Sequence, residues 1–220
     1  MLKASTFIGG IMSAGMVILT VVAVLIFFGI LQRVLDRMYL TDRAALLLVA
    51  LMFVGTLLPR INLGMVSISL GGAVIPLGVC IYLLIRANSS AEVWRPLIGA
   101  VVTAAAVYGL SLLLPSEAEE LPADPILLFS LCGGIVACIL GRSRRGAFIC
   151  GILGMLLADT ATAVINWSQG VQQQLVLGGA GMADTVVISG VIAVLLAEIV
   201  GEITERVARR RHPAGEGNPS

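Results

Sequence analysis

Long apolar stretches, separated by short polar segments, fill almost the whole chain. A membrane-spanning helix needs about 20 apolar residues, and a helix satisfies all of its backbone polar groups internally, as lipid requires. Seven stretches fit this description, at residues 8–31, 44–58, 62–85, 96–114, 125–141, 146–167 and 175–200. The sequence therefore predicts an all-α fold, a polytopic bundle of about seven transmembrane helices.

The composition agrees with a membrane environment. The 220 residues are 58% hydrophobic and 12% charged, whereas a soluble domain is about 45–50% apolar and about 25% charged. A soluble fold of this length could not cover so much apolar surface, so the lipid bilayer is the predicted partner. The net charge of +1 gives no basis for binding nucleic acid.

Two of the spans need comment. The first, residues 8–31, is preceded only by Lys3 and is longer than the 7–15-residue core of a signal peptide, so it is predicted to be a retained helix. The second, residues 44–58, is short, and a re-entrant or tilted segment is the alternative for it.

The positions of lysine and arginine predict the orientation. When the gaps between spans are assigned alternately to the two sides, only Lys3 and Arg60 of the 14 cationic residues fall on one side. The other twelve are Arg33, Arg37, Arg43, Arg86, Arg95, Arg142, Arg144, Arg145, Arg206, Arg209, Arg210 and Arg211. Because cytoplasmic loops carry the excess of Lys and Arg, the N-terminus is predicted outside and the C-terminus inside. Miscounting one span would scramble this alternation, so the split also supports the count.

Residues 1–211 are predicted to form one transmembrane domain, located as a multi-pass protein in the cytoplasmic (inner) membrane. The acidic loop 115–124 has no Lys or Arg and suits the outer side. The tail 212–220 is rich in Gly, Pro and polar residues and is predicted to be a disordered cytoplasmic segment.

Two aspartates fall inside predicted spans, and an ionisable residue within a membrane is a functional-site hypothesis by default. Asp159 lies eight residues before Trp167, at the outer end of its span, and Asp184 lies eight residues after Val176, where the last span begins. At 1.5 Å per residue both are about 12 Å below the outer surface. Since the two helices are joined by a short loop and run antiparallel, the carboxylates are expected to face each other.

Polar residues and helix breakers accompany the aspartates. Asp159, Thr162 and Asn166 share one helical face. In SLGGAVIPLG, Gly71 and Gly72 lie about 14 Å deep and precede Pro76, which frees a carbonyl one turn earlier. A broken span at Gly71–Pro76 is therefore predicted, as in transporters that bind ions near the midplane. Glycine and proline are also ordinary in membrane helices, and a single buried aspartate can be structural.

The predicted ligand- or ion-binding residues are Asp159, Thr162, Asn166, Asp184, Gly71 and Gly72. No metal site or cofactor is predicted, because the only histidine, His212, is in the tail and the cysteines have no CxxC spacing. The four cysteines, which lie in apolar segments and are expected to be buried and unpaired, are Cys80, Cys132, Cys138 and Cys150.

The stretches SLGGAVIPLG, LLADTATAVINW and GGAGMADTVVISGVIAVLLAE resemble an uncharacterised prokaryotic family of integral membrane proteins, domain-of-unknown-function family 1614. The resemblance covers most of the chain from the second span onward, and it implies a polytopic membrane protein with no assigned reaction. A weaker similarity is to intramembrane aspartyl proteases of the GxGD type. Residues 181–184 read G-M-A-D, so alanine replaces the glycine before Asp184.

Three functions are compatible with these observations. The first is cation- or proton-coupled permeation of a small solute, in which the aspartate pair binds the ion. The second is an intramembrane aspartyl protease, in which two carboxylates share a proton and activate water. The third is a non-enzymatic scaffold or assembly factor. The sequence leaves open whether the chain is an enzyme, forms a homo-oligomer or binds a membrane partner, and it contains no phosphate-binding loop for ATP-driven transport.

Overall fold

The structure is a computed structural model, and it describes residues 42–114, 125–179 and 184–211. The predicted first span at 8–31, the acidic loop 115–124 and the predicted tail 212–220 lie outside these residues. The described elements, in chain order, are α4 (Asp42–Leu57), β1 (Ile61–Leu63), β2 (Val66–Ile68), the π-helix η1 (Leu70–Val74), α5 (Ile75–Ile85), α6 (Ser90–Leu113), α7 (Pro125–Gly141), α8 (Arg144–Ser168), β3 (Leu175–Leu177) and α9 (Thr185–Arg211).

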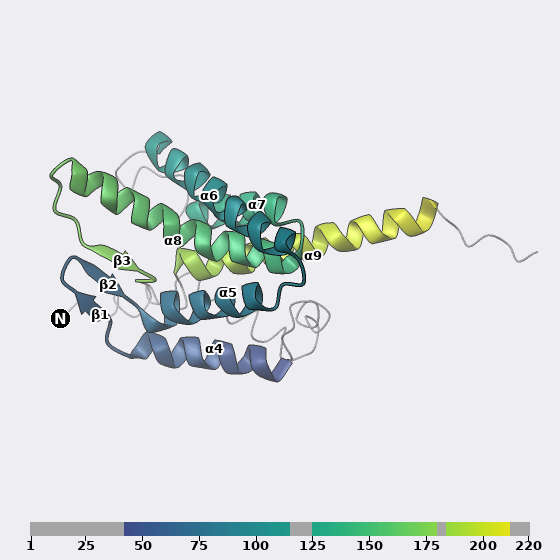
Figure 1. The fold of residues 1–220 in the computed structure, drawn as a ribbon, viewed down its shortest axis with the longest axis horizontal. Helices are drawn as coiled ribbons and strands as arrows, with labels where there is room; N and C mark the ends of the chain where they lie inside the picture. Colours follow the sequence, from purple (N-terminus) through teal and green to yellow (C-terminus); the bar gives the residue numbers. More distant parts are fainter. Residues whose placement is uncertain (1–41, 115–124, 180–183, 212–220) are drawn as a thin grey trace, which may run out of the picture.

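The fold is mostly helical, with the long helices side by side (Figure 1). Among the described residues, three helices are long and apolar enough to cross a membrane: Ser90–Leu113, Arg144–Ser168 and Thr185–Thr204. Shorter apolar helices cover Leu47–Leu57, Leu70–Ile85 and Pro125–Gly141. These lengths and compositions indicate a membrane protein.

The prediction of an all-α fold is wrong at two places, where a small sheet replaces helix. β1 pairs antiparallel with β2, and β2 pairs parallel with β3, with Val66 opposite Leu175. Gly64, at φ +73°, makes the turn between the first two strands. The predicted spans 62–85 and 175–200 therefore become helical only at Leu70 and Thr185. The sequence VSIS alternates apolar and polar residues, a strand period hidden inside a run of helix length.

The predicted break at Gly71–Pro76 takes the form of a change of helix type. The N–H groups of Ala73 and Val74 both donate to the Ser69 carbonyl, at 3.1 and 3.2 Å, and the π-turn continues into α5. Pro76 lies in the first turn of α5, where a missing N–H is tolerated. The helix is therefore continuous from Leu70 to Ile85.

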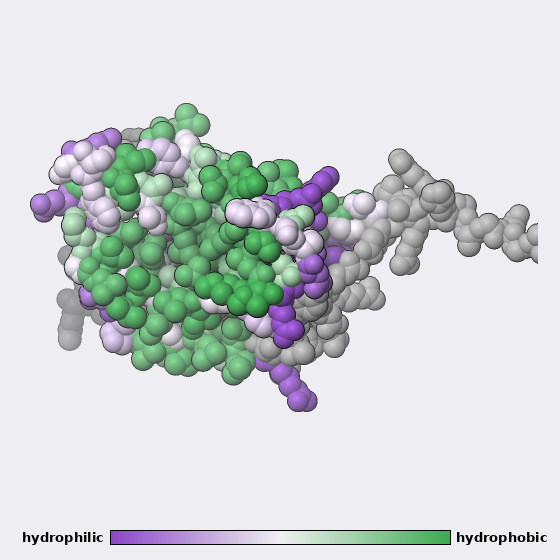
Figure 2. All heavy atoms as spheres, in the orientation of Figure 1, coloured by the Kyte–Doolittle hydropathy of each residue, from purple (hydrophilic) through white to green (hydrophobic). Residues whose placement is uncertain are grey.

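α8 is the centre of the bundle and contacts α5, α6, α7, α9 and β3. Its buried side chains Ile152 and Met155 pack with Leu83 of α5 and Val186 of α9. Large apolar side chains also cover the outside, and Figure 2 shows an apolar face between more polar ends. In water such a surface would be an aggregation hazard, whereas in lipid it is the expected exterior.

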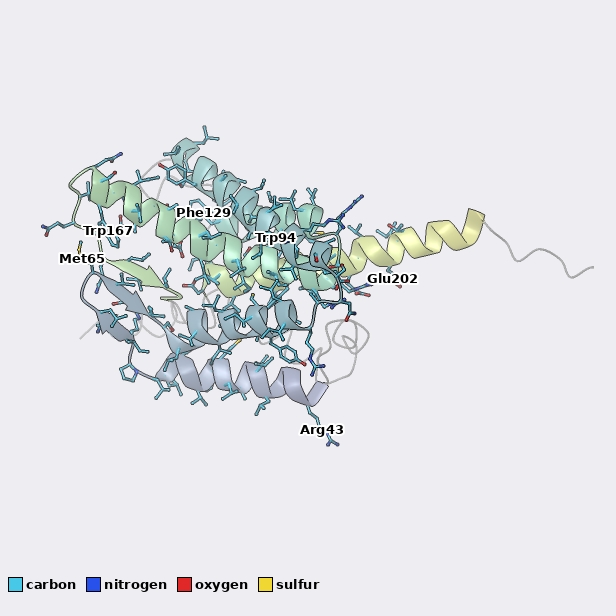
Figure 3. All side chains as sticks on the ribbon, viewed as in Figure 1. Arg43, Met65, Trp94, Phe129, Trp167 and Glu202 are labelled. Carbon is cyan, nitrogen blue, oxygen red and sulfur yellow. The ribbon has the colours of Figure 1, made fainter. Side chains whose placement is uncertain are left out.

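Charged side chains gather at one end of the bundle. Arg144 forms an ion pair with Glu198, which joins the start of α8 to α9, and Arg145 lies 3.5 Å from Glu92, which joins α8 to the start of α6. Figure 3 labels Arg43 and Glu202 toward this end and Met65 and Trp167 toward the opposite end, where the sheet lies. α9 extends beyond the other helices on the charged side (Figure 1).

Candidate functional site

The two aspartates occupy different kinds of position. Asp159 is half-buried in the middle of α8. Asp184, also half-buried, lies directly before α9, and its Oδ1 accepts hydrogen bonds from the Val186 N–H at 3.0 Å and from the Thr185 hydroxyl at 3.3 Å. Asp184 is thus the N-cap of α9 and not a residue within the helix, which begins at Thr185.

The two aspartates lie on neighbouring antiparallel helices. α8 and α9 run in opposite directions in contact with each other (Figure 1). Asp159 belongs to α8, and Asp184 caps the start of α9. Two like charges in an apolar bundle are stabilised when they bind a cation or share a proton. The pair is thus suited chemically to holding positive charge.

The start of η1 lies beside the start of α9. The Ser69 N–H donates to the carbonyl of Leu177, the last residue of β3, at 3.0 Å. One residue later, Gly178 adopts φ +67° and touches the backbone of Gly72 and Ala73. η1 also contacts α9 directly. The N-termini of η1 and α9, each carrying a partial positive charge, therefore lie close together, and the second carries the carboxylate of Asp184.

The predicted glycines are buried, and they differ in surroundings. Gly71 lies against α4, where a Cβ would fall 2.6 Å from the Thr56 hydroxyl, and Gly72 lies against Gly178. Pro76 has no N–H, so it donates neither to the Gly72 carbonyl at α-helical spacing nor to the Gly71 carbonyl at π-helical spacing. The Gly72 carbonyl faces Gly178, where an added Cβ would lie 2.8 Å from its oxygen.

Thr162 and Asn166 have partners elsewhere. The Thr162 hydroxyl donates to the Ala158 carbonyl of its own helix at 2.9 Å. The Asn166 amide donates to Gln173 in the loop after α8, and the indole N–H of Trp167 donates to the Gln173 carbonyl at 2.7 Å. The Asn166 side chain therefore holds the loop between α8 and β3.

Two further polar residues near the site are absent from the sequence prediction. Ser69 is 5% exposed, and its hydroxyl accepts from the Gly72 N–H at 3.4 Å, which caps η1. Ser67, 3% exposed, bonds to Asn62 and receives the Gln174 amide at 3.0 Å, so it ties β2 to the segment before β3. The alternation in VSIS was the available signal for both serines.

Arg60 reaches the same segment from the other side. Its guanidinium Nη2 donates to the Gly179 carbonyl at 2.7 Å, across 119 residues of sequence. From the sequence, Arg60 was expected only at the outer end of its span. In the structure it binds the backbone two residues after the end of β3.

Metal coordination by side chains alone finds little support in the described residues, where no three His, Cys, Asp or Glu side chains come together. All four cysteines are free thiols, and Cys80 and Cys150 are fully buried. A cation at the aspartate pair would need backbone carbonyls or hydroxyls to complete its coordination.

Comparison with known proteins gives one result. A family model described as a protein of unknown function (DUF1614) matches residues 26–196, which confirms the resemblance expected from the sequence motifs. No curated protein and no solved structure matches the chain. None of these comparisons supports the similarity to intramembrane aspartyl proteases.

Proposed function

We propose that this chain, which belongs to the DUF1614 family, is a multi-pass protein of the cytoplasmic membrane that lets a small cation or proton pass. The observation that carries the proposal is the position of Asp159 and Asp184. Asp159 is half-buried within α8, and Asp184 is half-buried at the start of α9, the antiparallel helix that packs against α8.

The non-helical backbone beside η1 supports this proposal. Within a membrane, non-helical chain is tolerated only where it is buried in protein or lines an aqueous cavity. Here the β2–η1 connection and the chain after β3 meet at Ser69 and Leu177, beside the start of α9. Helix ends and unpaired carbonyls near the midplane are a known means of coordinating ions in transporters. In our proposal the Gly71 and Gly72 carbonyls complete a site whose charge comes from the two aspartates.

The orientation follows from the positive charges. The described arginines of the predicted cytoplasmic gaps lie at the ends of α5, α6 and α8, opposite the sheet, where Arg145 pairs with Glu92. With this end in the cytoplasm, the C-terminus is inside and the sheet lies toward the outer surface. The cation would then enter from the side of the sheet.

The test uses the purified full-length chain in proteoliposomes. Proton entry is followed with pyranine enclosed in the vesicles, and sodium entry with radioactive Na⁺, under a membrane potential set by K⁺ and valinomycin. Asp159→Asn and Asp184→Asn should each abolish the flux of whichever ion passes, whereas Glu202→Gln, which removes an exposed carboxylate of α9, should leave it intact. Equal flux in the wild type and both aspartate variants would overturn the proposal.

An aspartyl protease remains the second candidate, because the same pair of carboxylates could activate a water molecule. It requires both side chains to reach one water while Asp184 caps α9. Either Asp→Asn variant should then cause an uncleaved membrane protein to accumulate in cells. A membrane proteome identical to that of the wild type would exclude this activity. A scaffold, the third candidate, should tolerate both substitutions.

A further inference from the structure

Small residues line the contact between α7, α8 and α9. We call this contact the small-residue seam, made by Gly133 and Gly134 of α7, Gly151 of α8, and Ser189, Gly190 and Ala193 of α9. A Cβ on Gly151 would lie 3.0 Å from the Gly190 Cα, so backbones meet here without side chains between them. Farther along, Ala137 and Ala147 continue the seam in the same packed cluster as Ala193.

A row of buried hydroxyl groups lies between Asp184 and this seam. Ser130 is fully buried, and its hydroxyl donates to the carbonyl of Thr185, the residue after Asp184, at 3.4 Å. Ser189 follows one turn later on α9, about 7 Å along the helix from Asp184. Its hydroxyl points at Gly133, where a Cβ would lie only 2.7 Å from Oγ.

The Ser189 hydroxyl is the unusual member of the row. The residue is 0% exposed, and its Oγ has no hydrogen-bond partner within the part of the chain that the structure describes. Buried polar groups are almost always paired, so an unpaired hydroxyl is available to a ligand that passes its own helix contact, and Ser189 differs from the other such group, Thr103, in lying five residues after Asp184 on α9. A hydroxyl oxygen is a suitable ligand for a cation or for a water molecule that carries a proton.

The seam ends at the charged end of the bundle. Glu198 lies nine residues beyond Ser189 and forms the ion pair with Arg144, whose side chains are 23% and 13% exposed. Gly201, on the next turn of α9, lies against the Arg144 guanidinium. The ion pair therefore covers the cytoplasmic end of the seam and closes it in this state.

From these observations we infer that the small-residue seam is the route by which the cation leaves the aspartate pair toward the cytoplasm, with Ser189 as a ligand on the way. The inference rests on the proposed function and adds its path. No side chain separates α8 from α9 where Gly151 meets Gly190, and Gly133 lies against the Ser189 hydroxyl beside the flexible side chain of Met155, so a slight separation of the helices exposes the hydroxyl and the glycine backbone to the passing ion. The Arg144–Glu198 pair must part when the ion leaves.

The test compares two hydroxyl deletions in the same proteoliposome assay. Ser189→Ala removes the seam hydroxyl. Thr103→Val removes the other fully buried hydroxyl without a partner among the described residues, which packs against Gly154 between α6 and α8, away from the seam. Removing an unpaired hydroxyl leaves no new unsatisfied group, so both variants should fold. We expect Ser189→Ala to lower the flux roughly fivefold, the effect of one lost ligand, and Thr103→Val to leave it unchanged.

A second measurement does not depend on flux. Ser189→Cys should react with a membrane-impermeant methanethiosulfonate applied while ions flow, and Thr103→Cys should not, each compared with the wild type and its native thiols. Loss of flux in Asp184→Asn together with normal flux in Ser189→Ala and an unreactive Ser189→Cys would overturn the seam and leave the proposed function standing. Flux that survives Asp184→Asn would overturn the proposed function itself.

Discussion

Gly178 follows β3 in the chain and packs against the backbone of η1. Its replacement by alanine should disrupt the packing of β3 on η1. Two separate features require glycine there. Its φ is +67°, and an added Cβ would lie 2.5 Å from the Ala73 nitrogen and 2.8 Å from the Gly72 oxygen. Both neighbours are backbone atoms, so no side-chain rotation can relieve the contact.

Alanine substitutions at two other glycines separate the cost of the left-handed backbone from the cost of the steric overlap. Gly170 has φ +79° and nothing within 4 Å of the Cβ position, so alanine there meets only the backbone strain. Gly78 lies in α5 with open space and no positive φ, so alanine there meets neither. Left-handed backbone costs an L-residue about 1–2 kcal/mol, and overpacking costs about 1–3 kcal/mol. The expected losses are therefore about 2–5 kcal/mol for Gly178→Ala and about 1–2 kcal/mol for Gly170→Ala.

The series is measured by reversible unfolding of the full-length chain in mixed micelles with increasing SDS, followed by far-UV circular dichroism. Gly78→Ala should stabilise the chain by about 0.5–1 kcal/mol, because alanine has less backbone entropy to lose in a helix. The decisive quantity is the difference between Gly178→Ala and Gly170→Ala. If Gly178→Ala is no more destabilising than Gly170→Ala, β3 and η1 do not pack as described.

Asp184→Asn should leave the free energy of unfolding unchanged, since asparagine is an equally good N-cap, whereas Asp184→Ala should lower it by about 0.5–2 kcal/mol in the same assay. Equal stability of the wild type and both variants would mean that α9 does not begin after Asp184. Arg144→Ala breaks a largely buried ion pair and should lower the free energy of unfolding by about 1–3 kcal/mol. Arg145→Ala, whose partner is exposed, should change it by less than about 1 kcal/mol. The reverse order would contradict the ion-pair geometry. Cys80 and Cys150 are fully buried and the other two cysteines are partly exposed, so mass spectrometry after brief maleimide treatment in detergent should find two labelled thiols on the folded chain and four after unfolding. Labelling of either buried cysteine at the rate of the exposed ones would show that the core is open.

Helix positions in the long apolar runs could be predicted well. The stretch 125–141 coincides with α7 (Pro125–Gly141), and 146–167 differs from α8 (Arg144–Ser168) by a residue or two. Both runs are bounded by proline, arginine or polar residues, and no competing structure interrupts them. The strands could not be predicted in the same way. Three apolar residues carry too little periodicity to stand out within a longer run, and the β2–β3 pairing depends on residues distant in sequence.

The proximity of Asp159 and Asp184 follows from counting residues from the loop between two antiparallel helices. The role of Asp184 as a helix cap does not, because it depends on where α9 begins. That start is set by β3 pairing with β2 and by Gly178 packing on η1, which no local pattern near Asp184 reveals. Ser69 was missed for the same reason, since its role as a cap requires η1 to begin at Leu70.

The parallel pairing of β2 with β3 has a consequence for how the protein is made. The contact between Arg60 and Gly179 closes a loop of 119 residues, and contacts so distant in sequence form late because loop closure must precede them. α4 to α8 can enter the bilayer in order of synthesis, yet β2 has no partner on its second edge until residue 177 has emerged from the ribosome. The β2–β3 pairing is therefore a late event of biogenesis, and a chain truncated before β3 would expose an unpaired strand edge that quality-control proteases can recognise.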